Sequence, residues 1–134
     1  MNWRIPLSDI DFDDEELSAV SEVIKSKWLT MGGVTQAFEK EFASYLGVKH
    51  AIAVTNCTAA LHLACLSTGL GPGDEAIVPS LTFVATANAV RYTGATPVFA
   101  DIIGPEDLNI SPSSIEKAIT NRTRAILVVH YGGY

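Results

Sequence analysis

The first third of the chain places its apolar residues at helical spacing. Apolar side chains recur every three or four positions over about residues 14–27, after an acidic start, and again over about residues 35–46. This period is typical of helices that bury one face, and acidic residues are favoured at a helix N-terminus. The pattern predicts two helices over these ranges, the second ended by Gly47.

Beyond residue 50, short apolar runs alternate with helical stretches. The runs predict buried strands over about residues 51–54, 75–78, 96–100 and 124–129. The stretches between them predict helices over about residues 58–68, 83–92 and 112–119, the last opened by Ser111 and Pro112. This alternation predicts an α/β fold in which helices cover both faces of a mostly parallel sheet, a three-layer α/β/α arrangement.

Composition and charge narrow the classes of partner. The 134 residues are 48% hydrophobic and carry 9 basic against 15 acidic side chains, a net charge of −6. No basic cluster is present to neutralise phosphates, so nucleic-acid binding is not expected. No apolar run approaches the roughly 18 residues of a membrane span, and residues 1–6 lack the apolar stretch of a signal peptide. We therefore expect a cytoplasmic protein without a membrane partner.

Neither the cysteines nor the acidic residues predict a metal site. Cys57 and Cys65 fall on one predicted helix, about 12 Å apart along its axis, which is too far for a disulfide. A zinc site needs about four ligands, and no set of His and Cys residues has the required spacing. The acidic run at residues 9–16 is interpreted as a helix start.

The candidate binding residues are those that directly follow the predicted strands, because ligands of open α/β sheets bind at the carboxyl ends of the strands. After the first strand, Asn56 and Thr58 stand where a helix begins and leaves its first backbone amides free, which favours a phosphate. A plain helix cap is the alternative, since Asn and Thr are ordinary capping residues. Phe83 follows the second strand, and either stacks on a flat heterocycle or belongs to the core.

Eight segments in order along the chain carry a family resemblance. They are IPLS (5–8), WLT (28–30), FEKEF (38–42), LGVKHA (46–51), NCTAALHL (56–63), GPGDE (71–75), PSLTFVATANA (79–89) and VHYGG (129–133). Together they are similar to the N-terminal part of the pyridoxal-phosphate-dependent sugar aminotransferases, the DegT/StrS family of the aspartate aminotransferase fold. The resemblance implies an N-terminal helical segment at residues 1–47 and, at residues 48–134, the first part of a fold-type-I large domain, which we expect to be incomplete here.

The resemblance implies roles for particular residues. Cys57, Thr58 and Ala59 match the segment that binds the phosphate of pyridoxal 5'-phosphate (PLP), although family members more often have Gly where Cys57 stands. Phe83 matches the aromatic side chain that stacks on the pyridine ring of the cofactor, and Thr30 matches a segment near the mouth of the active site. We therefore predict Cys57, Thr58, Ala59 and Phe83 as cofactor-binding residues and Thr30 as a substrate-side residue.

The activity implied by the resemblance is the transfer of an amino group, usually from glutamate, to a nucleotide-linked keto sugar by a homodimer. The five lysines of the chain match no family lysine, so no catalytic residue is assigned. The 134-residue chain on its own is therefore expected to be inactive. A sugar dehydratase of the same family, in which histidine replaces the lysine, is one alternative. A non-catalytic remnant or binding module of the same fold is the other.

Overall fold

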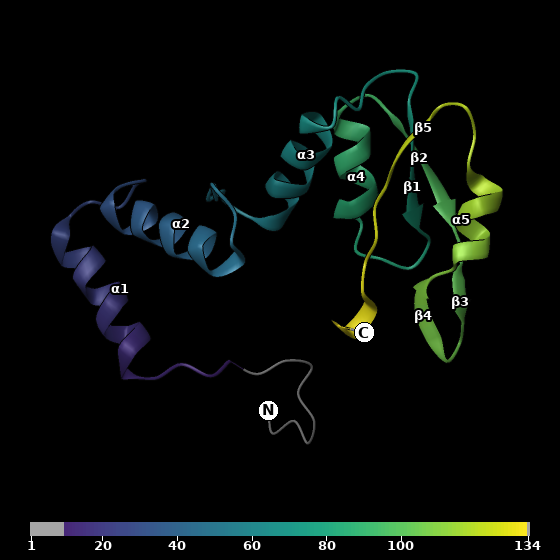
Figure 1. The fold of residues 1–134 in the computed structure, drawn as a ribbon. Coiled ribbons are helices and arrows are strands. Elements are labelled where there is room, and N and C mark those ends of the chain that lie inside the picture. The colour runs from purple at the N-terminus through teal and green to yellow at the C-terminus, as the bar shows by residue number, and fades with distance from the viewer. Residues whose placement is uncertain (1–9, 134) are drawn as a thin grey trace. The chain divides into compact units, whose positions relative to one another are not determined.

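The computed structural model describes residues 10–133 and divides into two compact units, Met1–Ala53 and Val54–Tyr134. The predicted boundary between residues 47 and 48 lies a short way before this division. The IPLS segment at residues 5–8, which carries part of the family resemblance, lies outside the described residues. Figure 1 shows the elements of both units.

Unit 1 contains the two helices that the apolar spacing predicts, α1 (Asp14–Ser26) and α2 (Gly33–Leu46). Asp13 opens α1 with a capping box: its side chain accepts a hydrogen bond from the Glu15 amide at 2.8 Å, and its own amide donates to Glu16 Oε2 at 2.9 Å. Gly47 ends α2 in the left-handed conformation, with φ 67°, which confirms the predicted stop.

The predicted strand over residues 51–54 is wrong, because no strand forms there in the described structure. An extended segment becomes a strand only when its backbone groups meet those of a neighbouring strand. Here the amide of Ala53 instead donates to the carboxylate of Glu39 on α2, at 2.8 Å. The apolar pattern predicted a buried strand, but it does not reveal whether a partner strand lies beside the segment.

Unit 2 contains a parallel sheet with the strand order β2-β1-β5 and a separate antiparallel hairpin of β3 and β4. Its elements are α3 (Cys57–Ser67), β1 (Glu75–Pro79), α4 (Ala85–Tyr92), β2 (Thr96–Ala100), β3 (Ile102–Gly104), β4 (Asp107–Ile110), α5 (Pro112–Ala118), β5 (Thr123–Ile126) and the 3-10 turn η1 (Tyr131–Gly133).

Helices cover both faces of this sheet (Figure 1). Successive side chains of a strand point to opposite faces, so Val78 packs with Cys65 of α3 and Val90 of α4, whereas Ile77 packs on the other face. The partly buried Ile115 of α5 packs against the cluster that contains Ile77. The α/β fold and its three layers are therefore confirmed. No helix among the described residues is both long and apolar enough to span a membrane.

Two local features of unit 2 differ from the sequence prediction. The β3–β4 hairpin was not predicted, because its strands are too short to give a clear alternation of apolar and polar residues. The last strand ends at Ile126 rather than near residue 129. Leu127 still donates to the carbonyl of Ile77 at 2.9 Å, but the next residue of β1 in line to donate is Pro79, which has no amide hydrogen.

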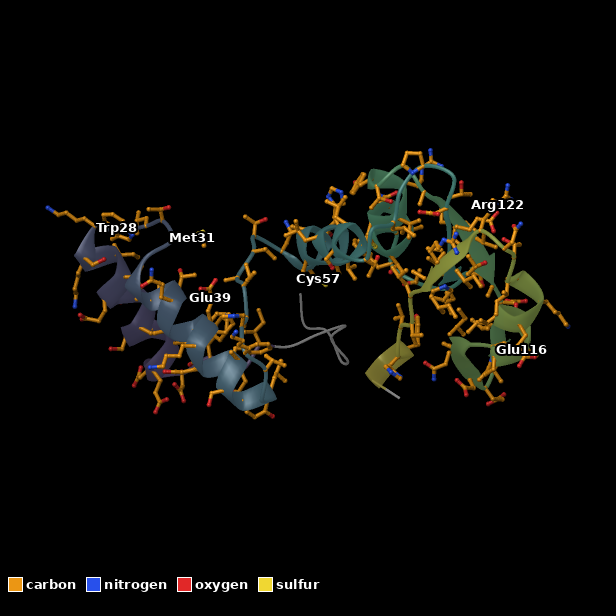
Figure 2. The ribbon with its side chains drawn as sticks, turned by 45° about the horizontal axis from the view of Figure 1, so that its top comes forward. Trp28, Met31, Glu39, Cys57, Glu116 and Arg122 are labelled. Carbon is orange, nitrogen blue, oxygen red and sulfur yellow. The ribbon has the colours of Figure 1, made fainter. Side chains whose placement is uncertain are left out.

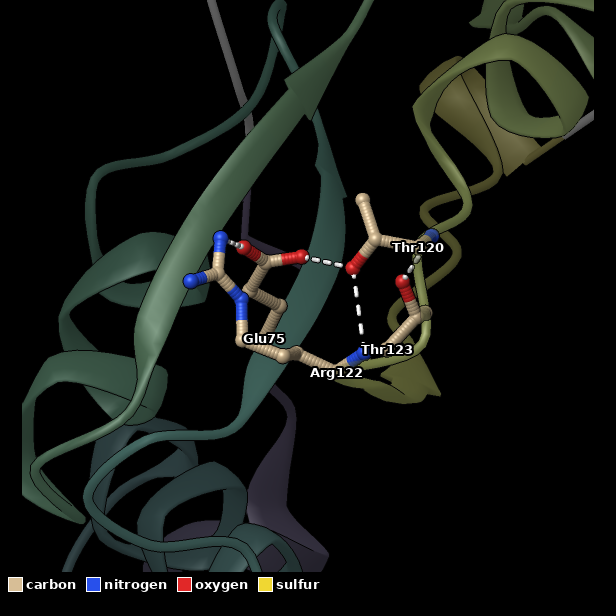
Figure 3. A network of polar contacts seen from close by, with 4 residues as sticks. All are labelled: Glu75, Thr120, Arg122 and Thr123. Atoms are coloured by element: carbon tan, nitrogen blue, oxygen red, sulfur yellow. Dashed lines mark hydrogen bonds and ion pairs between the residues drawn. The ribbon is translucent and has the colours of Figure 1, made fainter.

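The amino end of the sheet carries a polar network around Glu75 (Figure 3). The Thr120 hydroxyl donates to one carboxylate oxygen of Glu75, and the Arg122 guanidinium donates to the other. The hydrogen bond from Thr120, reinforced by the hydrogen bond and charge of Arg122, lowers the pKa of Glu75 below its ordinary value, against the opposing effect of burial. The Glu75 amide also donates to the Arg122 carbonyl at 2.9 Å, so backbone and side chain both fix the start of β5.

Candidate functional site

A hollow of about 590 Å³ lies where the loops that follow the parallel strands meet the start of α3. It is lined by Asn56, Cys57, Thr58, Leu61, Thr82, Phe83, Ala85, Thr86 and residues 127–129. Three of the predicted cofactor-binding residues, Cys57, Thr58 and Phe83, thus share one surface. The sequence predicted this grouping on the rule that ligands bind at the carboxyl ends of parallel strands. Phe83 and residues 127–129 follow strands of the sheet, but Cys57 and Thr58 do not, because residues 51–54 form no strand in the part of the chain that the structure describes.

The helix start at Cys57 (Figure 2) provides the polar part of the hollow. Asn56 caps α3: its side-chain oxygen accepts from the Ala59 amide at 2.9 Å, so the capping interpretation is confirmed. That bond engages the amide of Ala59, one of the three predicted for the phosphate. The amides of Cys57 and Thr58 lie in the first turn, where an α-helix offers no internal acceptor, so the cap leaves an anion-binding capacity in place.

Phe83 provides the aromatic part of the hollow. The residue is 76% exposed, so within the part of the chain that the structure describes it is not a core side chain. It precedes α4, which begins at Ala85 rather than at Phe83 as predicted, and its carbonyl accepts a hydrogen bond from the Thr86 amide at 3.1 Å. An exposed phenyl ring on the wall of a hollow is available to pack against the face of a flat ligand.

Two further residues of the hollow, Thr82 and Thr86, were missed by the sequence analysis. Their hydroxyls lie 2.9 Å apart and form a hydrogen bond, and Thr86 is only 5% exposed. A signal was present in the sequence, since two threonines four residues apart flank the start of an otherwise apolar helical face. The third wall, residues 127–129, was predicted as strand and instead follows β5 without regular secondary structure.

Thr30 belongs to unit 1, where it lines a hollow of about 580 Å³ at the turn between α1 and α2. The Trp28 ring closes this turn: its indole N–H donates to the Met31 carbonyl at 3.0 Å (Figure 2). A side chain at Gly32 would meet that ring, because its Cβ would lie 2.4 Å from Trp28 Nε1. The substrate-side role of Thr30 stays a prediction.

Asp101 and Lys117 of unit 2 carry side chains of a kind that can transfer protons. Asp101 follows β2, but its side chain accepts from the Ile102 amide at 2.8 Å and from the Ser80 hydroxyl at 3.4 Å, which gives it a structural role. No lysine is among the described residues that line the hollow, and Lys117, in unit 2, is exposed on the last turn of α5.

A second hollow of unit 2, of about 480 Å³, lies between the β3–β4 hairpin and η1. Asn109 joins its two sides, because its side-chain oxygen accepts from the Tyr131 amide at 2.9 Å. The hollow beside α3 is the stronger candidate, since it alone of the two places the first turn of an α-helix beside an exposed aromatic ring.

The chain matches the model of the DegT/DnrJ/EryC1/StrS aminotransferase family over residues 10–134. Among its relatives is the spore coat polysaccharide biosynthesis protein SpsC of Bacillus subtilis (strain 168). The two are 55% identical over 132 residues, which are 98% of this chain and 34% of SpsC.

The chain is also similar to solved structures. DesV of S. venezuelae is 43% identical, with a TM-score of 0.81, over 90% of this chain and 32% of that chain. A GDP-4-keto-6-deoxy-D-mannose-3-dehydratase of E. coli, solved with bound hydrated PLP, is 33% identical, with a TM-score of 0.82, over 92% of this chain and 33% of that chain. The present chain thus spans about a third of the length of each of these relatives.

Proposed function

Because this chain belongs to the DegT/DnrJ/EryC1/StrS aminotransferase family, we propose that its unit 2 provides part of the PLP site of a sugar aminotransferase. The enzyme transfers the amino group of glutamate to a nucleotide-linked keto sugar, so that glutamate becomes the 2-oxo acid and the sugar carbonyl becomes an amine. One observation supports this above all. The start of α3 and the exposed ring of Phe83 face the same hollow at the carboxyl end of a parallel sheet.

The residues of the hollow fit the two chemically different parts of PLP. The amides of Cys57 and Thr58, with the Thr58 hydroxyl, offer hydrogen-bond donors at the positive end of a helix dipole, which suits a phosphate. Phe83 offers an aromatic face to the pyridine ring. Leu61 and the two valines of residues 127–129 add apolar side chains to the lining, which restrict the access of water to the ring.

Each residue then has a distinct task. When bound, PLP supplies a site for the amino group and delocalises the charge that develops at the reacting carbon. Thr58 anchors the phosphate, and Phe83 orients the ring, so that the reacting atoms have a fixed position. Because the five lysines of the chain match no lysine of the family, we propose that the lysine that moves the proton comes from outside these 134 residues.

Further parts of the proposal concern the whole protein. We propose that it acts in the cytoplasm as a homodimer and that Thr30 contributes to the substrate side of the active site. The printed name of the B. subtilis relative, which refers to spore coat polysaccharide biosynthesis, supports a role for the aminated sugar in polysaccharide biosynthesis.

A PLP-dependent sugar dehydratase is the second candidate, because the E. coli dehydratase is 33% identical to this chain. The two reactions differ in their products. An aminotransferase consumes glutamate and forms an amino sugar, whereas a dehydratase removes a hydroxyl group from the sugar. Incubation of the full-length protein with PLP, glutamate and a nucleotide-linked keto sugar, followed by mass spectrometry of the sugar, separates them. The loss of a hydroxyl with no gain of nitrogen would refute the aminotransferase.

The cofactor site is tested by PLP titration of the full-length protein, followed by absorbance. Thr58→Val removes a hydrogen bond to a charged group, and we expect it to weaken PLP binding about ten-fold or more. Phe83→Ala removes the stacking ring and should weaken binding about ten-fold.

Two matched variants control for general effects of the substitutions. Thr68→Val changes a threonine at the other end of α3, and Phe99→Ala removes an exposed phenylalanine of β2 that is not part of the hollow. Both should bind PLP like the unmodified protein. Absence of PLP binding by the unmodified protein would instead support a non-catalytic binding module. Equal affinities in all four variants would reject the assigned roles of Thr58 and Phe83.

A further inference from the structure

Thr86 places a hydroxyl in an apolar environment. The residue is 5% exposed, and on the same helix Ala85, Ala89 and Val90 are buried as well. Burial of a hydroxyl is unfavourable unless the group is hydrogen-bonded, and here the bond is made to the hydroxyl of Thr82, at 2.9 Å. A valine would fill the same volume without this requirement, so the hydrogen bond to Thr82 is what distinguishes Thr86 from an apolar residue at this position.

The hydroxyl pair closes the turn that leads into α4. Val84 stands at the N-cap of this helix and, within the described structure, makes no side-chain capping bond. Thr86 instead makes two bonds across the turn to the residues that precede it, through its hydroxyl to Thr82 and through its amide to the carbonyl of Phe83, at 3.1 Å. The backbone immediately before and at Phe83 is therefore held by one buried residue.

The direction of the Phe83 ring depends on that backbone. The residue is 76% exposed, so packing restrains the ring little. We propose that Thr86 is a positioning residue, whose hydroxyl pair with Thr82 fixes the turn so that the Phe83 ring already faces the hollow before a flat heterocycle binds. This inference rests on the proposed function, in which the heterocycle is the pyridine ring of PLP.

The expected effect follows from preorganisation. Without the hydroxyl pair, the turn samples other conformations, and the ligand must order it on binding. The loss in affinity is then limited to the contribution of one neutral hydrogen bond, about five-fold in the dissociation constant. The hydroxyl of Thr86 acts through Phe83, so it should lose its influence on affinity when the ring is absent.

The test is a double-mutant cycle on the full-length protein, with PLP affinity as the measurement. Thr86→Val should weaken PLP binding about five-fold, and Thr86→Ser, which keeps the hydroxyl, should restore most of it. In a Phe83→Ala background, Thr86→Val should have no further effect. Thr93→Val is the matched control, because Thr93 lies at the other end of α4 and bonds its hydroxyl to the Val90 carbonyl.

The outcomes separate this inference from the proposed function. If the unmodified protein binds PLP and Phe83→Ala weakens binding, the cofactor site stands. Normal affinity of Thr86→Val would then overturn the inference alone, as would an equal loss on adding Thr86→Val to Phe83→Ala, because a general structural effect does not need the ring. If the unmodified protein binds no PLP, both proposals fall together.

Discussion

The two ends of the parallel sheet in unit 2 use their polar groups in opposite ways. At the amino end, the carboxylate of Glu75 is enclosed by Thr120 and Arg122, and each of its oxygens is bonded within the protein (Figure 3). At the carboxyl end, the first amides of α3 and the ring of Phe83 face a hollow. One end satisfies its polar groups internally, while the other leaves groups available to a ligand.

This difference indicates how the sheet separates stability from binding. The bonds of Glu75 fix the start of β5 beside β1, and the chain continues from β5 into residues 127–129, a wall of the hollow. The amino end thus positions part of the site without contributing a group to it. Variants at the amino end should change stability, and variants at the carboxyl end should change affinity for PLP.

The largest expected effect lies between the two ends, at Ile77. This side chain is completely buried in the central strand, so Ile77→Ala should lower the free energy of unfolding by about 2–5 kcal/mol, measured by urea denaturation of the full-length protein. The PLP affinity of the folded variant should stay unchanged. The control Ile103→Ala, at an exposed position of the hairpin, should cost much less. A large fall in PLP affinity for Ile77→Ala would contradict the separation of the two ends.

Substitution of two glycines, one near each end of the sheet, should have an intermediate effect on stability and allows the two ends to be compared directly. Gly94, which precedes β2, and Gly133, in η1, have φ values of 87° and 86°, where a side chain is strained. A Cβ on Gly94 would lie 2.9 Å from the Pro72 ring, whereas a Cβ on Gly133 would meet nothing within 4 Å among the described residues.

Gly133→Ala should therefore destabilise the protein by about 1–2 kcal/mol, the cost of the backbone conformation alone. Gly94→Ala should cost about 1 kcal/mol more, because the Pro72 ring must also move. Urea midpoints of the two variants measure the difference. Equal midpoints would show that the packing against Pro72 is not tight, and a larger cost for Gly133→Ala would reverse the comparison.

Elements with local signals were predicted well from the sequence. The N-cap Ser111 with Pro112 marked the start of α5, where the Ser111 hydroxyl accepts from the Ser114 amide at 3.3 Å. The strand predicted over residues 96–100 coincides with β2. One element that needs a distant partner was predicted wrongly. Residues 51–54 have the composition of a strand, but composition does not reveal which edge, if any, such a segment will join.

The candidate site, too, was predicted from the sequence only in part. The prediction that Cys57, Thr58 and Phe83 lie together combined the rule for the carboxyl ends of parallel strands with the family resemblance. The three residues do line one hollow, although residues 51–54 form no strand in the described structure. The hydroxyl pair of Thr82 and Thr86 could not be predicted in this way. It depends on the orientation of the turn before α4, which begins two residues later than the apolar pattern indicated.

The smallest expected effect concerns the charge of Glu75. Its side chain is 8% exposed but that of Arg122 is 64% exposed, so water screens much of their attraction. Because the pKa of Glu75 is lower in the folded state than its ordinary value of 4.5, the folded state binds fewer protons than the unfolded state in that range. The resulting stability is present above pH 4.5 and is lost as the pH falls through the folded-state pKa.

Glu75→Gln should remove this pH dependence while keeping an oxygen that can accept from Thr120. Urea denaturation of both proteins from pH 7 to pH 3 should show the unmodified protein to be more stable at neutral pH and the difference to shrink on acidification. Glu116→Gln, at an exposed position of α5 (Figure 2), is the matched control and should leave the pH profile unchanged. PLP affinity at pH 7 should be the same in all three proteins, since Glu75 lies at the end of the sheet away from the hollow. A difference in stability that grows on acidification would mean that the network does not stabilise the charged form of Glu75, and the contrast between the two ends would then lose its electrostatic basis.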